Sequence, residues 1–266
     1  MTTLTAAPAS PGARRRVRAL ATAETRLLLR NRTAVVNSVL MPLLLVAATR
    51  MIGLDTAGGP QLVVTALGIT LVFLTYYNLV TTYVARREEL VLQRMRTGEL
   101  TGPEILLATA VPTLLVTVAQ VVLVAAGVAV IGEWTAPVDV VLPLIALVGG
   151  AALMVVLAAA STSFTRTAES AQITTLPLVL VATSLSGLFV PLSAFPEALA
   201  GVLRFLPLAP VVELAQLGLT GRAWDGRAVD LAGAWSEALV PLAVLVAWTV
   251  VGGLVAGRVF RWAPRR

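Results

Sequence analysis

Long apolar runs with at most one charged residue each alternate with short polar segments along this chain of 266 residues. A helix needs about 20 residues to cross the roughly 30 Å of hydrocarbon in a membrane, and shorter apolar runs do not suffice. Six runs come close to or exceed this length and are predicted to be membrane-spanning helices. They are residues 35–52, 62–85, 105–131, 140–164, 173–192 and 238–260.

A charged island interrupts the apolar pattern between the second and third predicted spans. Residues 86–104 hold eight of the chain's 34 charged side chains. Because an Arg or Asp costs about 2.5 to 3.5 kcal/mol near the centre of a membrane helix, such an island must lie in water. It is therefore predicted to be a short connector, ending in Thr101-Gly102-Pro103, on which a soluble partner docks.

The N-terminal part has two regions of different composition. Residues 1–13 are rich in Pro, Ala, Thr and Ser, have no apolar period, and are predicted to be a disordered tail. Residues 14–32 carry seven Arg. Near one helical face they place Val17, Leu20, Leu27 and Leu28. This pattern predicts an amphipathic helix lying on the membrane surface, with an uncleaved charged leader as the alternative.

Residues 193–221 are apolar but are broken by three prolines and by charged side chains. Their runs 198–206 and 211–219 are too short to span, so two short re-entrant helices on the outer side are predicted. A single seventh span is the alternative, and it would leave Arg204 and Glu213 in hydrocarbon. For Glu213 a functional role stands beside pairing with Arg204 or capping of a short helix.

Composition narrows both the class of protein and its chemistry. With 58% hydrophobic and 13% charged residues and a mean hydropathy of +0.89, residues 14–266 are predicted to form one polytopic, all-α membrane domain. All twenty basic residues are Arg. Without Lys there is no Walker A loop, and without His or Cys there is no Ser-His-Asp triad, thiolate metal site or disulfide. The chain is therefore not expected to be an enzyme or to bind a cofactor or metal itself.

The distribution of Arg predicts the orientation in the membrane. With six spans, sixteen Arg fall on the side of the two termini and four fall opposite, which gives net charges of +10 and −4. The positive-inside rule then places both termini, the charged island and the 165–172 loop in the cytoplasm. A multi-pass location in the plasma membrane is expected, and Arg beside apolar spans argues against nucleic-acid binding.

Polar side chains recur at helical spacing in two of the predicted spans. They are Thr70, Phe73, Tyr77 and Thr81 in the second span, and Thr175, Thr183 and Ser186 in the fifth. They are expected either to line a cavity for an amphipathic or lipid-like substrate or to form hydrogen bonds between helices beside an interfacial aromatic belt, and both interpretations remain open.

Two motifs resemble one known family. The first is Arg87-Glu88 followed by 92–101 and Glu104-Ile105-Leu106; the second is 185–192 with Phe195-Pro196, Leu206-Pro207-Leu208 and Val212-Glu213. Both are similar to ABC transporter permeases of the second exporter type, which serve bacterial drug, lantibiotic and polysaccharide export. The first motif departs from the usual family pattern, with Leu90-Val91 where Gly-Thr is common and Gly98-Glu99 where Pro is common.

The resemblance implies a fold and a set of partners. The fold is the six-span, type V exporter-like fold with an N-terminal interfacial helix, and the partners are a second permease copy or homologue and two cytoplasmic ABC ATPase subunits that carry ATP and Mg²⁺. The charged island becomes a coupling helix centred on residues 92–100. Its expected coupling residues are Arg86, Arg87, Glu88, Glu89, Leu92, Arg94, Arg96 and Glu99, and the outer gate is expected at Phe189, Pro191, Pro196, Pro207 and Glu213.

The function expected on these grounds is ATP-driven export of a hydrophobic or amphipathic compound such as a drug, an antibiotic or a lipid-like molecule. A secondary carrier is a second hypothesis, although the spans hold almost no ionisable residues away from their ends. A membrane protein of assembly or immunity that transports nothing is a third.

Overall fold

The computed structural model describes residues 58–96, 100–131 and 134–263, together with residues 18, 21, 22, 25 and 26. All regular secondary structure among these residues is helical, and one isolated bridge joins Arg222 and Ala228. The elements in chain order are α3 (Gly58–Ile69), η2 (Thr70–Tyr77), α4 (Asn78–Glu88), α5 (Val91–Arg96), α6 (Gly102–Val130), α7 (Val141–Ser161), α8 (Ala171–Leu185), η3 (Leu192–Ala194), α9 (Glu197–Leu203), α10 (Ala209–Thr220) and α11 (Leu231–Val259).

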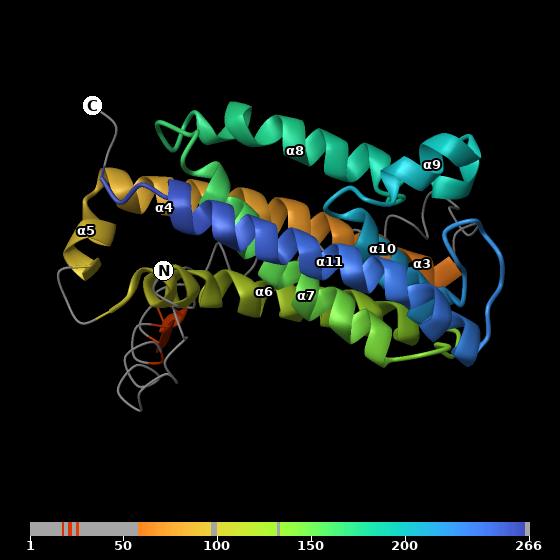
Figure 1. Ribbon diagram of the computed structural model, residues 1–266. Coiled ribbons are helices and arrows are strands. Elements are labelled where there is room, and N and C mark those ends of the chain that lie inside the picture. Colours follow the sequence, from red (N-terminus) through yellow and green to blue (C-terminus); the bar gives the residue numbers. More distant parts are fainter. Residues whose placement is uncertain are drawn as a thin grey trace, which may run out of the picture.

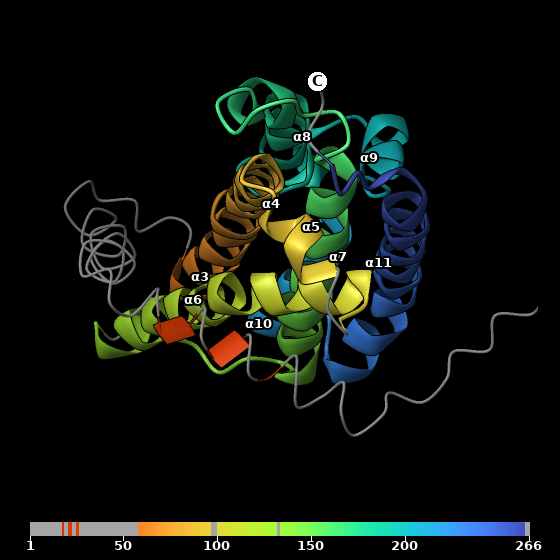
Figure 2. The same cartoon turned by 90° about the vertical axis from the view of Figure 1, so that its left-hand side faces the viewer.

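Four helices of the described part are long and apolar enough to cross a membrane. The first is the continuous helix of α3, η2 and α4, and the others are α6, α7 and α11. They correspond to the predicted spans 62–85, 105–131, 140–164 and 238–260. Figures 1 and 2 show these helices running side by side, with α5 at one end of the bundle and α9 at the other.

The fifth predicted span is shorter in the structure than in the sequence analysis. The helix α8 has 15 residues and ends at Leu185, whereas the prediction ran to residue 192. The chain turns at Gly187, whose φ of +81° lies in the left-handed region that favours glycine. At about 1.5 Å per residue, α8 covers some 22 Å, which is less than the hydrocarbon thickness.

The predicted first span, residues 35–52, lies outside the described residues, as do the predicted tail 1–13 and most of the predicted interfacial helix. Five residues of that helix are described, and all five are helical. Within them Thr22 Oγ1 donates to the Arg18 carbonyl at 2.7 Å, and Thr25 Oγ1 donates to the Ala21 carbonyl at 2.8 Å. These i to i−4 contacts agree with the predicted helix.

The segment after α8 folds into two short helices, as its prolines predict. Pro196 precedes α9, and Pro210 stands in the first turn of α10, where its missing N–H is tolerated. The helix α10 is almost entirely buried among α3, α7 and α11. At Gly218 it approaches α7 so closely that a Cβ would lie 2.3 Å from Pro143 Cδ. Thus α10 is a core element of the fold.

The middle of the second span is a π-helix, η2. Its i to i+5 hydrogen bonds widen each turn, so residues three and four apart no longer repeat on one face. Its buried side chains pack against α7, where Gly150 leaves room because a Cβ would lie 2.7 Å from Leu71 Cδ1. The π-helix therefore changes which side chains of this span point toward its neighbours.

Candidate coupling site and transport path

The charged island forms a distinct corner at the α5 end of the bundle. The helix α4 ends at Glu88, and Leu90, with φ of +62°, turns the chain into α5. Residues 97–99 lie outside the described part. The helix α6 then begins in a capping box, in which Glu104 Oε2 accepts a 2.7 Å hydrogen bond from the Thr101 N–H. In Figure 2 the short helix α5 lies in front of the bundle, between α4 and α6.

Arg87 is buried at this corner, with only 1% of its surface exposed. Its Nη1 donates to the Thr162 carbonyl at 2.8 Å, and its Nη2 donates to the carbonyls of Thr165 at 2.5 Å and Arg166 at 3.2 Å. These acceptors follow directly after α7, where helix carbonyls have no partner within the helix and a cation is favoured. The Arg87 side chain thus joins the second span to the connection between α7 and α8.

Two further side chains of the island are used within the chain. Glu88 Oε2 accepts a hydrogen bond from the Ala168 N–H at 3.1 Å, which adds a second tie between α4 and the same connection. Arg86 Nη1 donates to Thr109 Oγ1 on α6 at 3.3 Å. Arg86, Arg87 and Glu88 therefore make intramolecular contacts that join the end of α4, just before α5, to α6 and to the α7–α8 connection.

The remaining predicted coupling residues divide by exposure. Glu89, Arg94 and Arg96 are exposed, whereas the side chain of Leu92, also on α5, is fully buried. Glu99 lies outside the described residues. Leu92 therefore anchors α5 to its own chain, and Glu89, Arg94 and Arg96 are the charged side chains exposed around this helix.

The predicted transport-path residues of the second span do not form one uniform surface. Thr70 is buried, Tyr77 and Thr81 are half-buried, and Phe73 is 48% exposed. Their exposure therefore varies along the span, and the π-helix η2 alters the spacing of three and four on which the expected shared face rests. Thr81 Oγ1 donates to the Tyr77 carbonyl in the preceding turn at 3.1 Å.

On α8 the predicted hydroxyl groups do share a buried face. Thr175, Thr183 and Ser186 are at most 8% exposed, and α8 packs beside η2 and α4. Each hydroxyl donates to a carbonyl one turn earlier: Thr175 to Ala171 at 2.7 Å, Thr183 to Val179 at 2.8 Å, and Ser186 to Ala182. These polar side chains are thus satisfied inside a helix–helix contact.

Several polar contacts between spans were not predicted from the sequence. Thr75 and Thr117 are fully buried, with their hydroxyl oxygens 2.8 Å apart, and Tyr76 Oη lies 2.9 Å from Ser161 Oγ. Thr70 Oγ1 donates to Gln120 Oε1 at 3.4 Å. For Thr70 this contact is a hydrogen bond between helices, one of the two roles expected for these polar side chains. No sequence periodicity pointed to the pairs made by Thr75 and Tyr76.

An apolar groove of about 560 Å³ lies between α7 and α11. Its walls include Leu144, Val148, Leu245 and Val246, and none of the predicted path residues contributes to it. Its composition matches a surface that faces lipid.

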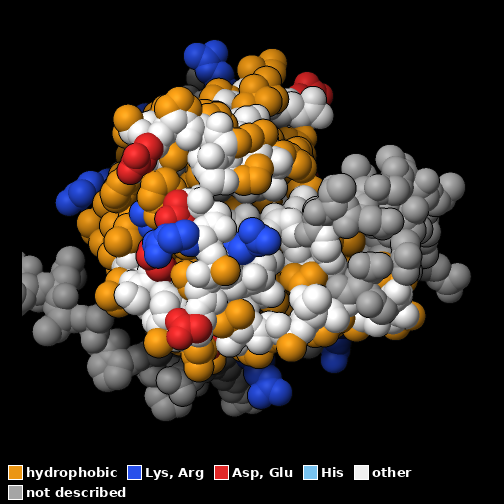
Figure 3. Space-filling view, turned by 90° about the vertical axis from the view of Figure 1, so that its right-hand side faces the viewer, with side chains coloured by type: hydrophobic (Ala, Val, Ile, Leu, Met, Phe, Trp, Pro, Cys, Tyr) orange, Lys and Arg blue, Asp and Glu red, His pale blue; other side chains and the backbone are white. Residues whose placement is uncertain are grey.

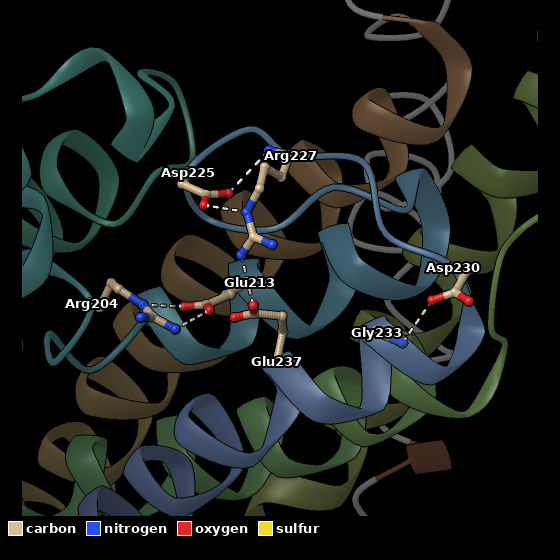
Figure 4. Close-up of polar contacts among 7 residues, drawn as sticks. All are labelled: Arg204, Glu213, Asp225, Arg227, Asp230, Gly233 and Glu237. Carbon is tan, nitrogen blue, oxygen red and sulfur yellow. Dashed lines mark hydrogen bonds and ion pairs between the residues drawn. The ribbon is translucent and has the colours of Figure 1, made fainter.

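At the opposite end of the bundle, Glu213 on α10 forms a two-point ion pair with Arg204. The distances are 2.5 Å from Arg204 Nη2 to Glu213 Oε1 and 3.1 Å from Nε to Oε2. Glu213 is 3% exposed, and the Arg204 guanidinium also stacks on Trp224, 4.7 Å from the ring centre. The predicted pairing of Glu213 is confirmed, and Figure 4 shows it beside the charges of the following loop.

A second ion-paired group stands next to this pair. Arg227 contacts Asp225 at 2.7 Å and Glu237 on α11 at 2.9 Å, and both acids are partly exposed. The hydrogen bond from Arg227 holds the pKa of Asp225 below its ordinary value. Figure 3, which views this end, shows Arg and acidic side chains next to each other among uncharged ones.

The other predicted outer-gate residues differ in exposure. Phe189, Pro191 and Pro196 are exposed, and Pro207 is half-buried. A small apolar cluster of Leu192, Ala200 and Leu203 holds η3 and α9 together, separately from the main core. The Arg204–Glu213 pair therefore joins the end of α9 to the buried helix α10.

Comparison with known proteins gives one match. The family model for the ABC-2 type transporter matches residues 15–219, which includes the charged island and most of α10. No curated protein and no solved structure matches this chain.

Proposed function

The chain belongs to the ABC-2 type transporter family, and from this premise we propose that it is the permease subunit of an ATP-driven exporter in a bacterial inner membrane. The cargo proposed is a hydrophobic or amphipathic compound, moved outward. ATP and Mg²⁺ are held by a separate cytoplasmic ABC ATPase subunit, and two permease chains form the complete membrane unit. Both termini and α5 face the cytoplasm in this proposal.

The observation that carries the proposal is the construction of the α5 corner. A helix of six residues would not hold its position by itself, because isolated short helices are unstable in water. Here the Leu92 side chain of α5 is buried in the chain. Arg87 and Glu88 bind the end of α4, which leads into α5, to the α7–α8 connection. A push on α5 therefore reaches α4 and α7 together, which is what a coupling element requires.

The exposed charges of α5 indicate the chemistry of the docking surface. Arg94 and Arg96 are exposed on the same short helix, and Glu89 precedes it. Mixed charges at an interface rim set orientation and association rate more than affinity. We propose that these three side chains meet complementary charges in a groove of the ATPase subunit.

The buried charges favour ATP-driven transport over a proton-driven carrier. Among the described residues, Glu213 is the one buried acid, and it is ion-paired with Arg204. A proton pathway normally uses ionisable groups within the membrane that exchange protons. The described spans offer no such series of acids.

Purification of the complex tests this function. The tagged chain is expressed in its native host, purified in mild detergent and reconstituted in nanodiscs. We expect two copies of this chain with two nucleotide-binding subunits by native mass spectrometry, and ATP hydrolysis that vanadate inhibits. Arg222→Glu, a charge reversal at the α9 end, serves as the control and should leave the complex intact. A chain that purifies without any ATP-binding subunit would contradict the proposal and favour a carrier or an assembly protein.

A further inference from the structure

Three aromatic side chains and one arginine pack in series at the α5 end of the bundle. The Tyr83 ring, on α4, meets the Phe260 ring edge to face, with centroids 6.4 Å apart and an interplanar angle of 89°. Phe260 in turn meets Trp262 at 4.8 Å and 65°. The Arg96 guanidinium of α5 stands over the Trp262 ring, 5.2 Å from its centre. This series connects the residues that follow α11 to the second span and to α5.

Trp262 also lies directly against the start of α6. A Cβ at Gly102 would be 2.6 Å from Trp262 Cζ2 and 3.1 Å from Cη2. Glycine is the residue at this position that leaves room for the indole ring. Trp262 therefore lies between α5 and α6, where it contacts the helix before residues 97–99 and the helix after them.

The path of the chain after α11 holds these rings in place. The helix ends at Val259, and Phe260 adopts an extended conformation with φ of −61° and ψ of 124°. Ser163 Oγ donates to the Val259 carbonyl at 2.7 Å, so the end of α11 is also tied to the connection after α7. Tyr83 Oη donates to the Leu106 carbonyl on α6 at 2.9 Å. Figure 1 shows the ends of α4 and α11 next to α5.

We propose that residues 260–262 are a positioning element for α5, with Trp262 as the side chain that sets the position of α5 relative to α6. The proposal rests on the proposed function, because α5 is taken as the element that docks the ATPase subunit. Cation–π and edge-to-face contacts restrain the helix through Arg96 and Phe260 without fixing it rigidly. The residues after α11 thereby become part of the coupling site, although they are far from the charged island in sequence.

The position of α5 is measured first in the purified chain, without any ATPase. The chain contains no Cys, so Arg94→Cys and Arg166→Cys give two unique spin-label sites, and the distance between them reports on α5. We expect one narrow distance distribution in this background. Adding Trp262→Ala should increase the displaced population of α5 roughly three- to tenfold, the order expected for loss of a cation–π and an aromatic contact.

Three matched variants separate positioning from general damage. Trp262→Phe keeps an aromatic ring and should retain the narrow distribution, and Trp134→Ala, in the connection between α6 and α7, should leave it unchanged. In Gly102→Ala the added methyl group overlaps the Trp262 ring, and the distance distribution should become broader. An unchanged distribution in both Trp262→Ala and Gly102→Ala overturns the proposal.

The reconstituted complex then tests the consequence for coupling. With the native ATPase present, Trp262→Ala should lower the amount of cargo moved per ATP hydrolysed, and Trp262→Phe should restore it. If Trp262→Ala broadens the distance distribution but transport per ATP is unchanged, the role in coupling is overturned. If no ATPase subunit accompanies even the unmodified chain, the proposed function fails and the docking role fails with it, whereas a broadened distribution still supports the positioning of α5.

Discussion

Arg87 and Thr162 are 75 residues apart in the chain and are joined by a 2.8 Å hydrogen bond from the guanidinium to the carbonyl. The same side chain reaches the carbonyls of Thr165 and Arg166. A planar guanidinium with five donors in fixed directions suits several carbonyls at once, which a lysine ammonium on a flexible stem does not. The Arg87 side chain therefore links the end of α4 to the α7–α8 connection.

Loss of this side chain should destabilise the chain strongly. Arg87→Ala removes three donors from carbonyls in a buried site, and we expect the free energy of unfolding to fall by about 3 kcal/mol, since hydrogen bonds to charged groups contribute ~1.5–3 kcal/mol each. Arg87→Lys should recover part of this loss. Thermal unfolding in detergent measures the effect. The exposed Arg94→Ala is the control and should change stability by about 0.5 kcal/mol or less; equal losses in the two variants would contradict the stabilising role of the Arg87 hydrogen bonds.

The sequence predicted the long helices well because their signal is local. Apolar runs with at most one charged residue predicted the second, third, fourth and last spans, and two short helices after Pro196 followed from proline spacing and run length. It overestimated α8, because residues 186–192 remain apolar although the turn at Gly187 ends the helix. It also missed the π-helix η2, which packs against α6 and α7.

The candidate site was predictable to a smaller degree because its contacts are distant in sequence. Hydropathy located the charged island, but no local pattern distinguishes buried Arg87 from exposed Arg94. The pairing of Glu213 with Arg204 could be anticipated, since both lie on neighbouring short helices. Trp262 carried no signal at all, because its partners Arg96 and Gly102 belong to another part of the chain.

Close packing of α10 against α7 gives a test of the fold. A side chain at Gly218 meets Pro143 Cδ at 2.3 Å and the Asp139 carbonyl at 2.8 Å, so Gly218→Ala should destabilise the chain by about 1–3 kcal/mol. At Gly257, on α11, a Cβ meets nothing within 4 Å. Gly257→Ala should therefore be neutral or stabilise by up to about 1 kcal/mol. The difference between their melting temperatures is the measurement, and similar values would refute this packing.

The Arg204–Glu213 pair should behave as a coupled unit in a double-mutant cycle. Each single change to Ala leaves a charge without its partner in a largely buried site and should cost about 3 kcal/mol, whereas the double variant should cost less than the sum. A coupling energy of about 1–3 kcal/mol is expected from thermal unfolding. Additive effects would mean that the two side chains do not interact in the membrane.

Labelling of single cysteines tests the proposed orientation. Because the chain has no Cys of its own, Arg222→Cys at the α9 end and Arg166→Cys at the α5 end are each unique targets. An impermeant maleimide added to intact cells should label the first directly and the second only after the membrane is opened. Labelling in the reverse order would overturn the orientation derived from the Arg distribution.

The central claim, that α5 transmits ATP hydrolysis to transport, is tested most directly by reversing its exposed charges. Arg94→Glu/Arg96→Glu is reconstituted with the ATPase subunit in proteoliposomes, with Arg222→Glu as the matched control, and cargo movement and phosphate release are measured together. We predict that the α5 variant inserts normally and loses transport per ATP hydrolysed, while the control keeps it. Unchanged transport per ATP in the α5 variant would contradict the account.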